Sequence, residues 1–121
     1  MKCRDYTHAT EYVLPVAPSP NLPTQRSVYL YAALCPFEGT VVSLGRGTSA
    51  PFEVYGHPAM IGRTFSFTPR PTAGAKHPPL EGQLCRGVDL SGMPLNEARE
   101  VGFSLKYVID AYADLRLGDK F

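Results

Sequence analysis

The residues best suited to chemistry in this sequence lie between Phe37 and Phe52. This stretch places a carboxylate at Glu38 and a guanidinium at Arg46 among several glycines and hydroxyl side chains. Glycine permits positive φ angles, and hydroxyls beside glycines favour turns. A loop of this composition exposes backbone N–H groups and one side chain of each charge, which suits a polar, oxygen-rich ligand. The same residues also fit a tight surface loop in which Glu38 and Arg46 pair with each other or with the backbone.

Several motifs lie on either side of this stretch and accompany it along the chain. They are Ser19-Pro20-Asn21-Leu22-Pro23, Phe37-Glu38-Gly39-Thr40, Gly45-Arg46-Gly47-Thr48 with Pro51-Phe52, Gly56-His57-Pro58 and Cys85-Arg86-Gly87-Val88-Asp89-Leu90. In this order they resemble the exo-β-N-acetylmuramidase (NamZ-like) family of peptidoglycan glycosidases, formerly a domain of unknown function. The resemblance covers most of the chain. The sequence departs from the family at Val41 or Val42 and at Leu44, where members often have Asn and an acidic residue respectively.

The resemblance implies that residues 1–121 form a single domain, equivalent to most of the carboxy-terminal domain of a longer, two-domain enzyme. Such an enzyme releases terminal N-acetylmuramic acid from peptidoglycan. Its amino-terminal Rossmann-like domain supplies the main catalytic carboxylates, so its cleft lies between two domains. The expected partners are a muropeptide or peptidoglycan fragment and that amino-terminal domain, and no cofactor is expected. This chain alone is expected to be inactive, and the full-length protein is expected to be periplasmic or extracellular.

In that setting Glu38 is the candidate catalytic residue, because it is the carboxylate that lies in the stretch from Phe37 to Phe52. Glycoside hydrolysis commonly uses two carboxyl groups, so one candidate supplies half of a mechanism. Glu38 either transfers a proton or orients the substrate or Arg46, and the orienting role is favoured. Arg46 is predicted to bind the lactyl carboxylate that distinguishes N-acetylmuramic acid from N-acetylglucosamine, because a guanidinium binds a carboxylate in bidentate geometry.

Four uncharged side chains complete the predicted substrate-binding set: Asn21, Thr40, Ser43 and Thr48. Asn21 lies in a stiff, extended segment, because prolines fix φ and restrict the residues before them. An Asx-turn is the favoured alternative for its side chain. His57, between Gly56 and Pro58, is interpreted as a turn histidine rather than a catalytic base. No metal site is predicted, because the sequence has no ligand cluster.

An α+β domain with long loops rich in proline and glycine is predicted to position these residues. A helix is expected from a Thr24 cap to just before Pro36, although residues 28–31 also fit a buried strand. Strands are expected at 52–55, ending at Gly56, at 65–68 and at 84–90, in a small mixed sheet. One long amphipathic helix is expected over 95–117, with Gly118 as its stop.

Composition limits the classes of function. Lys and Arg number 12 against 11 Asp and Glu, so no basic face for nucleic acid is predicted. No apolar run approaches the ~20 residues of a membrane span, and the polar start Met1-Lys2-Cys3-Arg4-Asp5 does not indicate a signal peptide. Cys3, Cys35 and Cys85 are interpreted as small buried thiols, with a Cys35–Cys85 disulfide left open.

Two other functions remain open from the sequence. The first is a non-catalytic module that binds cell-wall carbohydrate, which 7 Tyr and 6 Phe allow although Trp is absent. The second is a structural domain that stabilises its neighbour. Binding of muramic acid fragments by the isolated chain would separate these functions from the split cleft.

Overall fold

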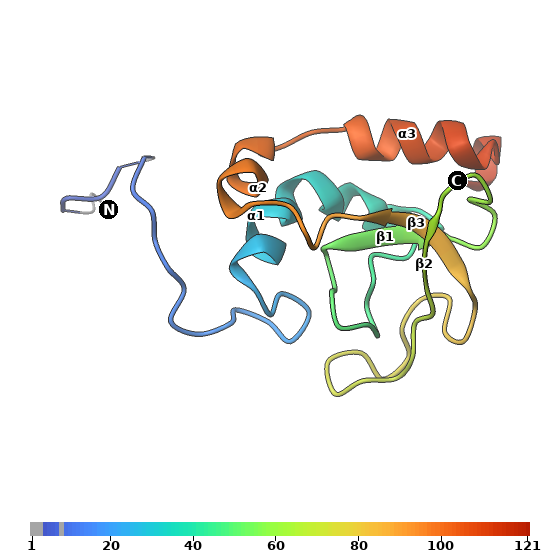
Figure 1. Cartoon of the computed structure of the whole chain (residues 1–121), viewed down its shortest axis with the longest axis horizontal. Helices are drawn as coiled ribbons and strands as arrows, with labels where there is room; N and C mark the ends of the chain where they lie inside the picture. The colour runs from blue at the N-terminus through green and yellow to red at the C-terminus, as the bar shows by residue number, and fades with distance from the viewer. Residues whose placement is uncertain (1–3, 8) are drawn as a thin grey trace.

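The structure is a computed structural model that describes residues 4–7 and 9–121. Its elements in chain order are α1 (Gln25–Leu34), the 3-10 helix η1 (Cys35–Gly39), β1 (Val54–His57), β2 (Phe65–Phe67), β3 (Cys85–Asp89), α2 (Leu95–Val101), α3 (Lys106–Leu115) and the 3-10 helix η2 (Gly118–Lys120) (Figure 1). The predicted α+β class is confirmed.

The sheet has the strand order β1-β3-β2, and both pairs of strands are antiparallel. The expectation of a mixed sheet is therefore wrong, because parallel neighbours need a long crossover that is usually helical, and the strands here are joined by loops. Gly87 of β3 lies opposite Gly56 of β1 and Phe65 of β2. A Cβ at Gly87 would collide with the carbonyl oxygen of Tyr55, so the centre of the sheet requires glycine.

The positions of β2 and β3 agree with the sequence prediction to within two residues. The prediction for β1 is wrong at its carboxyl end, because the strand continues through Gly56 to His57. Gly56 pairs with Gly87 on one side, and on the other its N–H and carbonyl both bond to Ser43. Pairing on both sides keeps this glycine within the sheet, although glycine is unfavourable in a strand by itself.

Helix α1 begins and ends where the sequence predicts. The Thr24 side chain accepts a hydrogen bond from Ser27 N at 3.0 Å, and Ser27 Oγ accepts one from Thr24 N at 3.2 Å. This reciprocal cap satisfies two backbone donors that a helix start otherwise leaves without partners. Helix α1 ends at Leu34, before Pro36, and the chain continues directly into η1.

The single long helix expected over 95–117 is wrong. The chain instead forms α2 and α3, separated at Gly102, whose φ of 54° and ψ of −146° are strongly disfavoured for other residues. The break changes which apolar residues are buried. Ala111 and Leu115 of α3 are buried, whereas Ile109 and Tyr112 are exposed. Helix α3 ends at a left-handed Arg116 rather than at Gly118, which begins η2.

We expect Gly102→Ala to lower the free energy of unfolding by about 1–3 kcal/mol, the usual cost of a disfavoured backbone conformation. An added Cβ would have Glu100 O at 3.9 Å as its nearest neighbour, so crowding contributes little. Gly92→Ala is the matched control, because a Cβ there meets nothing within 4 Å and no positive φ is required. Urea denaturation followed by circular dichroism measures both variants. Equal midpoints would contradict a conformational role for Gly102.

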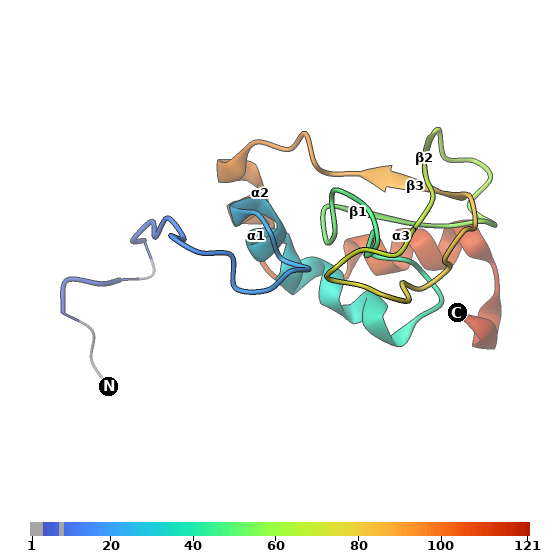
Figure 2. The same ribbon diagram turned by 90° about the horizontal axis from the view of Figure 1, so that it is seen from below.

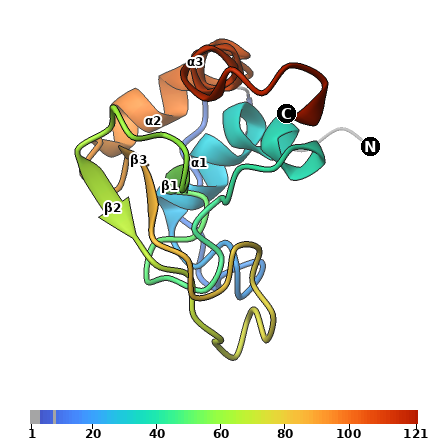
Figure 3. The same ribbon diagram turned by 90° about the vertical axis from the view of Figure 1, so that its right-hand side faces the viewer.

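Helices α1 and α3 lie on the same side of the sheet, and the core fills the space between them (Figure 3). The Tyr55 ring of β1 stacks on Phe37 of η1 at 4.9 Å and meets Tyr107 of α3 edge-on at 5.9 Å. Burial raises the pKa of Tyr55 to about 12. This aromatic cluster holds η1, and therefore Glu38, against the sheet.

The described residues at the amino-terminal end extend away from the rest of the molecule, whereas Pro20 and Asn21, closer to α1, pack against Gly74 (Figures 1 and 2). The amino-terminal end is joined to the helices by Arg99 Nη1, which lies 3.0 Å from Glu11 Oε1, and by Leu14 N, which donates to Gln25 Oε1 at 3.0 Å. Within the described residues, none of the helices is long and apolar enough to cross a membrane.

Cys35 and Cys85 are free thiols in this structure, so the disulfide left open by the sequence is not formed. Cys85 lies in the central strand and is fully buried, which raises the pKa of its thiol to about 11. A protonated, buried thiol behaves as a small apolar side chain. Cys3 lies outside the described residues.

Candidate functional site

The candidate site is built on residues 40–53, the loop between η1 and β1. Ser43 and Gly56 exchange two backbone hydrogen bonds of 2.9 Å, and Phe52 N donates to Leu44 O at 2.8 Å. Gly45 and Gly47 have φ angles of 70° and 81°, in the left-handed region that favours glycine. The loop is thus fixed at its base to the sheet, and two glycines set the direction of the turn that carries Arg46.

Phe52 supports Arg46 from below. Its φ of 57° is unusual for a bulky residue and is held by the backbone bond to Leu44. The Arg46 guanidinium carbon lies 5.3 Å from the centre of the Phe52 ring, and Tyr31 contacts the same ring at 5.2 Å. A cation over an aromatic face is attracted to it. Local backbone strain therefore coincides with the placement of the predicted ligand-binding cation.

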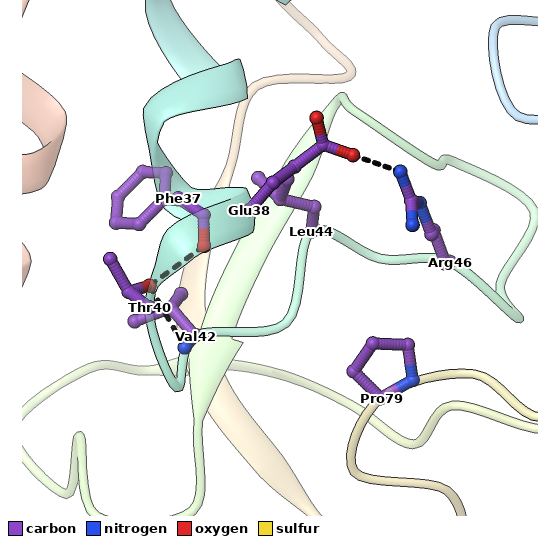
Figure 4. A pocket seen from close by; sticks show the side chains of 7 residues that line it. All are labelled: Phe37, Glu38, Thr40, Val42, Leu44, Arg46 and Pro79. Atoms are coloured by element: carbon purple, nitrogen blue, oxygen red, sulfur yellow. Dashed lines mark hydrogen bonds and ion pairs between the residues drawn. The ribbon is translucent and has the colours of Figure 1, made fainter.

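Glu38 and Arg46 meet at a pocket of about 80 Å³ (Figure 4). Arg46 Nη2 donates to Glu38 Oε1, and the two side chains are 34% and 37% exposed respectively. The pocket is lined by Phe37, Glu38, Thr40, Val42, Leu44, Arg46 and Pro79. The two charges therefore pair with each other, as the surface-loop interpretation expects, and both line a pocket. A ligand site at this pocket stays a prediction.

The remaining donors of Arg46 are not used by the described residues. Nη1 has no hydrogen-bond partner there, and Nε is buried without one. A guanidinium carries five N–H donors in a fixed planar arrangement. The Glu38 contact and the Phe52 ring hold that plane in place and leave part of it open to an incoming anion.

The structure separates the other predicted site residues. Thr40 lines the Arg46 pocket, but its hydroxyl donates to Phe37 O at 2.9 Å and accepts from Val42 N at 3.2 Å. Ser43 is fully buried and its Oγ accepts from Gly45 N at 3.3 Å, so it shapes the loop. The structure thus brings Glu38, Thr40 and Arg46 together and leaves Ser43 beneath them.

Asn21 and Thr48 line a different hollow, of about 330 Å³. Asn21 Nδ2 donates to Gly74 O at 3.1 Å, so the expected Asx-turn is wrong for its side chain. The turn is made instead by Ser19, whose Oγ accepts from Asn21 N at 3.2 Å. Thr48 Oγ1 donates to Gly45 O at 2.6 Å and accepts from Ala50 N at 3.1 Å.

Two residues around Arg46 were not predicted from the sequence to take part in the site. Pro79 lines the Arg46 pocket from a loop far along the chain, and no local pattern links it to this site. Phe52, although part of the quoted motif, was not given a role beneath Arg46. A large aromatic residue in the same loop as Arg46 was the available signal for a stacking partner.

Glu53 is a buried carboxylate just beyond the loop, and it is structural. Its Oε1 accepts from Thr24 Oγ1, and its Oε2 lies 3.1 Å from Arg26 Nη1. Arg26 Nε also donates to Met93 O at 2.7 Å. These contacts tie α1 to the end of the loop and to the segment after β3. Glu53 does not line the Arg46 pocket, so Glu38 is the carboxylate found there within the described residues.

His57 is the last residue of β1 and pairs with Arg86, so the interpretation as a turn histidine is wrong for its backbone. The turn begins at the next residue, Pro58. His57 Nδ1 accepts a hydrogen bond from Ala59 N at 3.1 Å, which requires a lone pair on that nitrogen. Burial lowers the pKa of His57, in agreement with a neutral ring. In the loop after β1, Arg63 Nε donates to Asp114 Oδ2 at 2.7 Å. The described residues contain no group of three or more His, Cys, Asp or Glu arranged to hold a metal ion.

Comparison with known proteins gives consistent matches. The family model for the carboxy-terminal part of exo-beta-N-acetylmuramidase NamZ matches residues 29–117. Peptidoglycan beta-N-acetylmuramidase NamZ from Bacillus subtilis (strain 168) is 38% identical over 119 residues, covering 82% of this chain and 27% of the relative. A crystal structure of a DUF1343 family protein from Bacteroides fragilis NCTC 9343 is 54% identical, with a TM-score of 0.93.

That similarity covers 98% of this chain and 33% of the Bacteroides protein. The chain therefore spans about a third or less of the length of these relatives. The family model extends over the site loop, residues 69–79 and all three strands. On this agreement of sequence and fold, the chain belongs to the family of the carboxy-terminal domain of the exo-β-N-acetylmuramidase NamZ.

Proposed function

We propose that this chain forms one wall of the substrate cleft of a peptidoglycan glycoside hydrolase that releases terminal N-acetylmuramic acid. The observation that carries the proposal is the Arg46 guanidinium, which is held in place at a pocket and has donors to spare. Membership of the family and the name of the Bacillus subtilis relative support the substrate class. Because peptidoglycan lies outside the cytoplasmic membrane, we place the full-length protein in the periplasm or outside the cell.

Arg46 recognises the lactyl carboxylate in this proposal. A charge-assisted, bidentate pair gives both free energy and geometric selectivity. The Phe52 ring and Glu38 fix the guanidinium before the ligand arrives, which lowers the entropy cost of binding. N-acetylglucosamine has no carboxylate at this position, so the same pocket gives it no comparable interaction.

Glu38 acts mainly as a positioning residue for Arg46. Its carboxylate already accepts from Arg46 Nη2, so one of its oxygens is occupied. Hydrolysis of a glycosidic bond generally needs two carboxyl groups roughly 5–9.5 Å apart, and the Arg46 pocket contains one within the described residues. The second group, and the main proton transfers, are assigned to the part of the enzyme that corresponds to the rest of the relatives' length.

The size of the pocket supports a divided cleft. Pockets that enclose small molecules measure about 300–1,000 Å³, whereas the Arg46 pocket measures about 80 Å³. It can take the lactyl group but cannot enclose a sugar ring. The ring must therefore lie over the pocket and be covered by another surface, which we assign to the amino-terminal domain of the full-length enzyme.

The proposal is tested by comparing the isolated chain with the full-length enzyme on a peptidoglycan disaccharide that ends in N-acetylmuramic acid. We expect the isolated chain to release no sugar, because it lacks the second carboxyl group, and the full-length enzyme to release it. Calorimetric titration with the same disaccharide is run in parallel. Tight binding by the isolated chain would favour a binding module, and no binding by either protein would favour a structural domain.

A further inference from the structure

A second hollow lies beside the Arg46 pocket, along the same pair of segments. Gly47 directly follows Arg46 in the loop and lines this second hollow. Gly47 O accepts a hydrogen bond from Arg70 N at 2.9 Å, which joins the loop to residues 69–79. That segment contributes Pro79 to the first pocket and Thr72 to the second. The two hollows are therefore neighbours, with the contact between Gly47 and Arg70 between them.

The chemistry of the two hollows differs. The first contains the Glu38–Arg46 ion pair. The second is lined by four uncharged polar side chains, Asn21, Thr48, Ser49 and Thr72, and none of its described lining residues is charged. Asn21 Oδ1 and the Ser49 hydroxyl have no partner among residues 4–7 and 9–121, so an acceptor and a hydroxyl remain available.

The walls of the second hollow are rigid. Pro20, Pro23 and Pro51 line it, and proline has a fixed φ. The Thr72–Ala75 turn is closed by backbone bonds of 2.9 and 3.2 Å, and its Gly74 packs so closely on Pro20 that a Cβ would lie 2.8 Å from the Pro20 Cβ. Rigid walls lower the entropy cost of binding a ligand.

We propose that this hollow binds the uncharged N-acetylhexosamine that follows the terminal N-acetylmuramic acid, on the leaving side of the scissile bond. This assignment rests on the proposed function. In peptidoglycan strands, a sugar that carries a carboxylate alternates with one that does not. The first hollow offers the Arg46 cation to the sugar with the carboxylate, and the adjacent hollow offers an uncharged surface to the next sugar. The volume of about 330 Å³ is within the range of pockets that hold small molecules.

The test fills the hollow from two different segments of the chain in the full-length enzyme. Ala73→Tyr and Ser49→Tyr each place a ring there from an exposed position. Ala59→Tyr is the matched control, because Ala59 is also exposed in a turn but lines a different hollow. Two substrates are compared: the disaccharide of N-acetylmuramic acid and N-acetylglucosamine, and the β-fluoride of N-acetylmuramic acid, which carries no second sugar.

We expect both filling variants to lower kcat/KM for the disaccharide by about 10-fold or more, while hydrolysis of the fluoride stays within about twofold of wild type. The control is expected to hydrolyse both substrates normally. Unchanged hydrolysis of both substrates by both filling variants, or an equal loss on both substrates, would overturn the second binding site and leave the proposed function standing. If wild-type enzyme hydrolyses neither substrate, the proposed function itself fails.

Discussion

Full-length enzyme carrying Arg46→Lys is expected to lose roughly 10- to 100-fold in kcat/KM on substrates that end in N-acetylmuramic acid, the usual value of a hydrogen bond to a charged group. On substrates that end in N-acetylglucosamine, the loss is expected to stay within about threefold, because uncharged sugars gain little from the guanidinium. The measurement is steady-state kinetics on the two substrates in parallel.

The physical reason is the geometry of the guanidinium rather than its charge. Lysine keeps the positive charge, but its ammonium is a point charge that cannot form the planar, two-bond contact with a carboxylate. It also fits the contact with the Phe52 ring less well, since the flat guanidinium stacks on an aromatic face. The conservative change therefore separates recognition of the lactyl group from simple electrostatic attraction.

Arg86→Lys is the control for this experiment. Arg86 is exposed on β3 and does not line the Arg46 pocket. Its replacement by lysine makes the same chemical change away from the pocket, so the kinetics of this variant are expected to match those of wild type. An equal loss on both substrates in Arg46→Lys would show that Arg46 holds the loop together and does not read the lactyl group. Thermal melts of both variants would then be expected to differ, which gives an independent check.

Gly47→Ala is expected to cause the second large effect, a loss of folding stability of about 3 kcal/mol or more, from strain and crowding combined. A Cβ at Gly47 would lie 2.5 Å from Arg70 O and 2.6 Å from Pro78 Cγ. The loop and residues 69–79 would have to separate, which weakens the Arg70 N–Gly47 O hydrogen bond. Chemical denaturation of the isolated chain measures the loss.

Gly82→Ala is the matched control for the cost of placing a side chain on a residue with positive φ. Gly82 has a φ of 74°, close to the 81° of Gly47, but an added Cβ there meets nothing within 4 Å. Its expected cost is about 1–2 kcal/mol, the penalty for a left-handed residue with a side chain. The difference between the two variants isolates the crowding at Gly47. Equal losses of stability in the two variants would contradict this prediction. They would mean that the loop and residues 69–79 move apart at little cost in free energy.

Much of the local structure was predictable because its causes are local. The hydroxyl of Thr24 and the missing N–H of Pro36 mark the limits of α1, and both act within one turn of the helix. Alternating residues around Ser66 and Val88 predicted β2 and β3, because successive side chains of a strand point to opposite faces of the sheet. The prediction of one long helix was wrong because the apolar spacing continues across Gly102. That spacing does not show that Gly102 has a positive φ, which ends the helix.

The candidate site was predictable only in part. The glycines of the loop and the charges of Glu38 and Arg46 are properties of the residues themselves, so the sequence indicated both a turn and an ion pair. That Glu53 is buried against Arg26 could not be read locally, because its partners lie 27 and 29 residues away. The same holds for Pro79, which reaches the pocket from another loop.

The sequence by itself therefore determined the family, the α+β class, the capped first helix and a glycine-rich turn that presents opposite charges. Only the tertiary structure decided that Asn21 and Thr48 line a separate, uncharged hollow, that Ser43 is buried, and that the last helix is divided. Caps, turns and strand alternation depend on neighbours a few residues away. The grouping of side chains around a pocket depends on which distant segments pack together, and no short pattern encodes that.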